Sequence, residues 1–105
     1  MRTLLIVLSF AATAATALQA ADATAGKAAY DKSCKSCHGA DGTANPAIAK
    51  MFKVDIKDLK SSDVQAMSDD DFKMIIMNGK GKMKPVASVS GAAADNVVAY
   101  IRSLK

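Results

Sequence analysis

The chain has 105 residues, half of them hydrophobic, and a formal net charge of +4 at pH 7. This length allows one domain once any targeting segment is removed. The positive charge is mild and spread along the chain, so it excludes a strongly basic nucleic-acid-binding protein.

The first residues are typical of a secretory signal peptide. A basic start, MRT, runs into LLIVLSFAATAATAL, which combines an apolar core with small residues near a cleavage site. The uncharged run, residues 3–18, is shorter than the ~20 residues that a spanning helix needs, so a retained anchor is the weaker interpretation. We therefore expect residues 1–21 to be removed and residues 22–105 to form one domain in a bacterial periplasm, with no stable membrane anchor.

The exported part predicts an all-α fold of three to five short helices. The first covers residues 23–36 and contains Gly26, which costs roughly 1 kcal/mol relative to alanine inside a helix. A glycine at such a position suggests that another backbone passes close to it. Beyond the turn-rich loop GADGTANP, residues 47–52 predict one or two helical turns, and residues 53–63 look irregular.

Two further helices follow. Ser68 is expected to cap a helix that ends before Gly79, and the aspartates 69–71 fit its first turn, where a helix favours negative charge. Phe72, Ile75 and Ile76 form its expected buried face. Ser90 is expected to open the last helix. Its apolar stripe comprises Ala93, Val97, Tyr100, Ile101 and Leu104.

The only cysteines and the only histidine of the chain lie together, as Cys34, Cys37 and His38. A disulfide or a redox pair is one interpretation, but the alternating strands and helices of a thioredoxin-like protein are missing. A zinc site would need a fourth ligand, which only the aspartates could supply. Cys-x-x-Cys-His is the signature of covalent haem attachment, in which both thiols bond the porphyrin and the next residue binds iron. A core this small is usually marginal without a disulfide, a metal or a cofactor, which also favours haem.

The second iron ligand would be a methionine. A His/Met pair is typical of electron carriers and favours ferrous iron. Met74 and Met77 lie within a predicted helix and are interpreted as core filler. Met83 lies between lysines in the glycine-framed loop GKGKMKP, residues 79–85, so we expect it to be the ligand. Met67 is the alternative.

Three segments, GKAAYDKSCKSCH, NGKGKMKP and VVAYIRSL, resemble those of class I monohaem cytochromes c of the small soluble bacterial type. The resemblance covers the whole exported part. It implies that the N- and C-terminal helices cross at Gly26, with Tyr30, Val97 and Tyr100 packed around the crossing. It also implies a backbone carbonyl near Pro46 as acceptor for the His38 ring. Residues 54–62 are expected to hold the haem propionates.

The resemblance further implies a one-electron carrier that catalyses no reaction and binds one haem c. Cys34 and Cys37 would form the thioethers, and His38 and Met83 would ligate the iron. We expect a monomer whose redox partners have acidic docking surfaces and contact Lys35, Lys80, Lys82 and Lys84. An electron-accepting subunit of a dehydrogenase or oxidase complex remains an alternative, as does a haem-based gas sensor.

Overall fold

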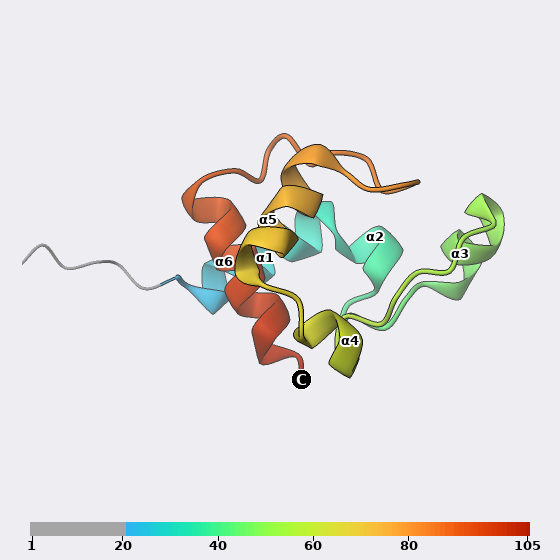
Figure 1. Cartoon of the computed structure of the whole chain (residues 1–105), viewed down its shortest axis with the longest axis horizontal. Helices are drawn as coiled ribbons and strands as arrows, with labels where there is room; N and C mark the ends of the chain where they lie inside the picture. The colour runs from blue at the N-terminus through green and yellow to red at the C-terminus, as the bar shows by residue number, and fades with distance from the viewer. Residues whose placement is uncertain (1–20) are drawn as a thin grey trace, which may run out of the picture.

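The computed structural model describes residues 21–105, so the predicted signal peptide, except for residue 21, lies outside the described residues. This part of the chain contains six helices and no strand (Figure 1). They are α1 (Ala23–Ser33), α2 (Lys35–His38), α3 (Pro46–Phe52), α4 (Ser62–Gln65), α5 (Asp69–Asn78) and α6 (Ala92–Ser103). The all-α prediction is confirmed. The helices outnumber the expected three to five because the first one is divided at Cys34 and a short turn, α4, follows the irregular stretch.

None of the helices in residues 21–105 combines the length and hydrophobicity needed to cross a lipid bilayer.

Helices α1 and α6 cross at Gly26, as the sequence predicted. A Cβ atom at this glycine would lie 1.8 Å from the carbonyl oxygen of Asn96 in α6 and 2.4 Å from its carbonyl carbon. Only a residue without a side chain allows this approach, which explains a glycine inside a helix. At the edge of the crossing, the backbone N–H of Asp22 donates to the side-chain oxygen of Asn96 over 2.8 Å.

The core lies between α1, α5 and α6. Tyr30 and Val97 are fully buried beside the crossing, and the ring of Tyr30 meets that of Tyr100 edge-on, with centroids 5.0 Å apart. The other buried side chains are those of Cys34, Leu59, Val64, Phe72, Ile76, Val89, Ala94, Val98 and Ile101. The predicted stripe of the last helix is therefore confirmed.

The start of α5 is built as predicted, and the start of α6 is not. The Ser68 side chain accepts from the backbone N–H of Asp71, and Asp69 forms an ion pair with Arg102, so the aspartates have a structural role. In α6 the capping position is Gly91, with φ 55°, and no side chain caps the helix. The prediction of Ser90 as the opening residue was wrong, because a glycine can make the left-handed entry that a serine resists.

Residues 44–58, which we call the arm, project from the rest of the domain and carry α3 at their end (Figure 1). The arm is joined at its base by two backbone hydrogen bonds, from Asn45 N–H to Cys37 O (2.9 Å) and from Leu59 N–H to Gly42 O (3.0 Å). The Asn45 side chain caps α3, and Pro46 occupies its first turn. The chain therefore returns to the body beside the point where it left.

Candidate functional site

The cysteine and histidine side chains of the motif are brought together by one helical turn. Helix α1 ends at Ser33, and α2 follows immediately, with the N–H groups of Cys37 and His38 both bonded to the carbonyl of Cys34. Residues spaced by three and four positions lie on one side of a helix. All three side chains accordingly line the same cavity.

This cavity has a volume of about 1140 Å³, above the roughly 300–1,000 Å³ of common small-molecule sites. The arm forms one wall, and α4, α5 and the loop around Met83 form another. Most of the lining is apolar, and it includes Ile48, Phe52, Val54, Ile56, Leu59, Val64, Phe72, Ile75, Ile76, Pro85, Val86 and Ile101. Such a site suits a large, mainly hydrophobic group.

Two features of His38 fit the role of a metal ligand. Its Nδ1 atom is buried and has no hydrogen-bond partner within residues 21–105, although a buried polar atom without a partner costs about 1–3 kcal/mol. Burial also lowers the pKa of the imidazole, which keeps it in the neutral form that binds metals. The hydrogen bond expected between this ring and a carbonyl near Pro46 is therefore not formed, since Pro46 begins α3 and is exposed.

The Cys34 thiol lacks the lowered pKa that is typical of a redox-active cysteine. Cys34 and Cys37 are not joined by a disulfide, and burial raises the pKa of the Cys34 thiol to about 11. Such a thiol stays protonated at neutral pH and is a poor nucleophile. Across the described part of the chain, no three His, Cys, Asp or Glu residues are grouped to hold a metal ion. The disulfide, redox and zinc interpretations therefore find no support.

Two tyrosines from opposite ends of the domain fix the chain just after His38. The hydroxyl of Tyr30 donates to the carbonyl of Gly39 over 2.6 Å, and that of Tyr100 donates to the carbonyl of Ala40 over 3.1 Å. The sequence predicted how the rings pack but not these hydrogen bonds. Their sign in the sequence is that both positions carry tyrosine, whose hydroxyl can donate a hydrogen bond, and not phenylalanine.

The loop around Met83 is a tight reversal. Lys80 and Met83 exchange two backbone hydrogen bonds of 2.9 and 3.0 Å, and Gly79 and Gly81 have φ angles of 75° and 57°. A Cβ at Gly79 would lie 2.5 Å from the Met83 carbonyl oxygen. The half-buried Met83 lines the cavity together with the three residues of the motif.

The other methionines separate into two groups. Met67, the alternative ligand, is half-buried and also lines the cavity. Met74 and Met77 are 60% and 49% exposed, so the prediction that they fill the core was wrong. Phe72 and Ile76 occupy the buried side of α5, and these methionines lie on its opposite side.

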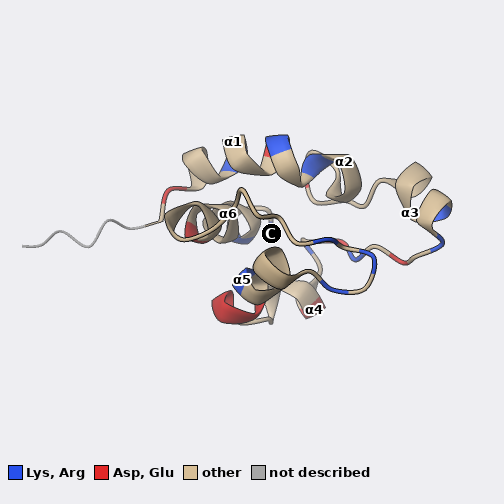
Figure 2. Ribbon diagram, turned by 90° about the horizontal axis from the view of Figure 1, so that it is seen from above, with Lys and Arg blue, Asp and Glu red and all other residues tan. Residues whose placement is uncertain are grey.

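Lysines gather around the mouth of the cavity. Lys80, Lys82 and Lys84 belong to the Met83 loop, and these three lysines and Lys57 of the arm line the cavity. Lys35 is exposed on α2. The acidic first turn of α5 lies away from the arm (Figure 2). The Met83 loop is therefore the basic part of the site, and the first turn of α5 is an acidic region further from the arm.

Comparisons with known proteins agree with this architecture. No curated protein sequence matches the chain significantly. The solved structure of the KustC0563 c-type cytochrome has the same fold, with a TM-score of 0.64 and 24% identity over 76% of this chain and 96% of that one. Residues 21–101 match the protein-family model described as cytochrome c oxidase, cbb3-type, subunit III. The chain therefore belongs to this cytochrome c family, and it is an electron-transfer protein whose domain type binds haem c covalently.

Proposed function

We propose that this protein is an exported one-electron carrier with a single haem c. The observation that carries the proposal is the cavity, into which the attachment motif and Met83 both face. Cys34 and Cys37 would form the thioether bonds, and His38 and Met83 would bind the iron. When bound, the haem supplies a reversible one-electron couple between ferric and ferrous iron.

The residues of the chain determine how that couple behaves. His38 stays neutral and cannot drift away, because the adjacent thioethers and the Tyr30–Gly39 hydrogen bond hold its backbone. The Met83 sulfur favours ferrous iron. The walls of the site are mainly apolar, and with His38 and Met83 both bound the iron would have no open position for a substrate. With the single histidine engaged as a ligand, the chain has no other imidazole for acid–base catalysis, so we infer that it catalyses no reaction.

The first experiment is periplasmic expression followed by absorption spectroscopy. We expect haem to stay on the polypeptide in a denaturing gel and the ferric protein to show the weak far-red band of iron–thioether ligation. Met83→Ala should abolish this band, whereas Met67→Ala and the exposed-site control Met74→Ala should keep it. A high-spin wild-type spectrum with immediate carbon monoxide binding would contradict the carrier function and favour a gas sensor. N-terminal sequencing of the secreted protein tests the removal of residues 1–21.

We propose that partners with acidic surfaces dock at Lys35, Lys80, Lys82 and Lys84. The ion pairs within the described residues involve other lysines, namely Lys27, Lys60 and Lys73, so these four are free to meet a partner. Complementary charge mainly sets the association rate and is screened by salt. Lys80→Glu/Lys82→Glu should slow reduction of a small anionic oxidant and accelerate that of a cationic one, by roughly tenfold at low salt. Lys27→Glu, on α1, is the control. Equal rates for wild type, the double variant and Lys27→Glu would contradict the docking role of these lysines.

The family description favours a second candidate, an electron-accepting subunit of an oxidase complex. The two functions share one fold and differ in partners. Purification from its natural host separates them. A carrier is recovered alone as a monomer from the periplasmic extract, and a subunit is recovered from the membrane fraction with stoichiometric partner chains.

A further inference from the structure

Arg102, near the end of α6, uses most of the hydrogen-bond donors of its guanidinium group. It donates to the carbonyl oxygens of Gln65 and Met67, at the junction of α4 and α5. Its Nε and one terminal nitrogen also donate to the carboxylate of Asp69, over 3.1 and 2.9 Å. The group lies 4.7 Å from the centre of the Phe72 ring, a cation–π distance. One side chain of α6 therefore contacts four residues around the entry to α5.

Helix α5 connects this point to the Met83 loop. At its other end, Gly79 leads directly into the loop, and the Ile76 carbonyl accepts from the backbone N–H of Val86 over 2.8 Å. The buried residues Phe72 and Ile76 pack the helix into the core between these ends. Since an α-helix of ten residues is a rigid rod of about 15 Å, a movement at its first turn is transmitted to its last.

We propose that Arg102 is a positioning residue for the iron ligand Met83. It acts through α5: the guanidinium fixes the start of the helix against α6, and the end of the helix carries the ligand loop. The inference rests on the proposed His/Met ligation. It assigns the effect to the hydrogen bonds with the two carbonyls, and not to the charge of Arg102.

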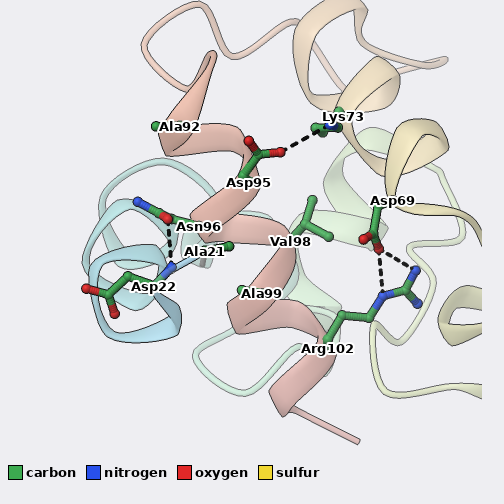
Figure 3. A pocket seen from close by; sticks show the side chains of 10 residues that line it. All are labelled: Ala21, Asp22, Asp69, Lys73, Ala92, Asp95, Asn96, Val98, Ala99 and Arg102. Carbon is green, nitrogen blue, oxygen red and sulfur yellow. Dashed lines mark hydrogen bonds and ion pairs between the residues drawn. The ribbon is translucent and has the colours of Figure 1, made fainter. Parts of the chain in front are cut away.

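A second ion pair between the same helices provides a matched comparison. Lys73 of α5 lies 3.1 Å from Asp95 of α6, in the same surface groove as Asp69 and Arg102 (Figure 3). Both pairs join α5 to α6, and both place the positive charge on a half-buried side chain. Lys73, however, has no carbonyl or aromatic partner within residues 21–105. Exposed ion pairs of this kind contribute about 0–1 kcal/mol.

The experiment compares holoproteins carrying Arg102→Gln, Arg102→Lys, Asp69→Asn and Lys73→Gln. The rate of carbon monoxide binding to the ferrous form measures how often Met83 leaves the iron, and the ferric far-red band measures its ligation. We expect both Arg102 variants to bind carbon monoxide about tenfold faster, which corresponds to ~1.4 kcal/mol, and to weaken the band. Arg102→Lys tests the charge, because lysine keeps it but cannot bind both carbonyls. Asp69→Asn and Lys73→Gln should stay within about twofold of wild type, because Asp69 loses only one ion pair and Lys73 only two, all at the surface.

Different outcomes identify different errors. If the Arg102 variants unfold at lower temperature but keep the wild-type band and carbon monoxide rate, Arg102 is only structural and the inference is wrong. If Lys73→Gln matches Arg102→Gln, loss of a charge or of any α5–α6 contact explains the effect, which also overturns it. If wild type itself shows no far-red band, the proposed ligation fails. In that case, amide hydrogen exchange of residues 79–86 still tests the role of Arg102. The inference requires faster exchange there in Arg102→Gln than in Lys73→Gln.

Discussion

The α1–α6 crossing and the arm are held in different ways. At the crossing, the chain contacts itself so closely that even one methyl group cannot be inserted, and the adjacent side chains are fully buried. The arm has the opposite character. None of its residues, 44–58, belongs to the buried core, and Phe52 at its end is 49% exposed. Backbone hydrogen bonds hold its base, while its apolar side chains line the cavity.

The difference indicates which part of the domain provides stability and which part forms the site. The crossing provides stability from contacts within the polypeptide, so a sequence change there acts on folding. The arm and the Met83 loop provide the two walls of the site, so a change there acts on the contents of the cavity. Substitutions in the two parts should therefore have separable effects on folding and on the site.

Gly26→Val should destabilise the protein most. The new side chain would overlap the Asn96 carbonyl, and the helices would have to separate, at a cost of at least about 3 kcal/mol. Denaturant unfolding measures this loss. Ala28→Val, at an exposed position of the same helix, is the control and should cost below about 1 kcal/mol. Equal losses in the two variants would show that the close crossing is not needed.

Gly79→Ala should disturb the site more than the fold. The positive φ angle and the 2.5 Å approach to the Met83 carbonyl oppose any side chain, so we expect a loss of about 1–2 kcal/mol together with a weakened far-red band. Gly81→Ala is the control, because its φ angle is also positive but no atom lies within 4 Å of the new Cβ. An unchanged band in Gly79→Ala would mean that the loop tolerates reshaping.

Tyr30→Phe should remove about 1–2 kcal/mol, because the partly buried Gly39 carbonyl loses its donor. The variant should also change how the free energy of unfolding depends on pH at alkaline pH. Burial raises the pKa of the Tyr30 hydroxyl well above its usual 10.0, so above this pH the unfolded chain releases a proton that the folded one keeps. Unfolding free energy therefore falls as pH rises past 10 in wild type, and less steeply in Tyr30→Phe. Parallel curves would exclude this contribution.

Met74→Gln should have the smallest effect, within about 0.5 kcal/mol of wild type by thermal unfolding. The side chain is 60% exposed and lies on the side of α5 opposite its buried residues. A loss comparable to that of Tyr30→Phe would show that this methionine is covered in solution.

The sequence predicted those features that depend on local spacing or on one special residue. The Ser68 cap and the glycine at the crossing are examples, because each is read within a few positions. Contacts made across the chain were not predictable in this way. The bonds from Arg102 to the carbonyls of Gln65 and Met67 span 37 and 35 positions, and nothing near Arg102 indicates them. The exposure of Met74 and Met77 was missed because apolar residues cover more of α5 than its buried side needs.

The crossing also sets an order of events during synthesis. Asp22 and Asn96, which meet at its edge, are 74 positions apart, so joining them closes a loop of nearly the whole domain. The entropy of closing such a loop is about 4 kcal/mol, and nothing offsets it until both helices exist. Stable burial of Tyr30 must therefore wait until residue 96 has been made. Until then, Cys34 and Cys37 remain on an open chain.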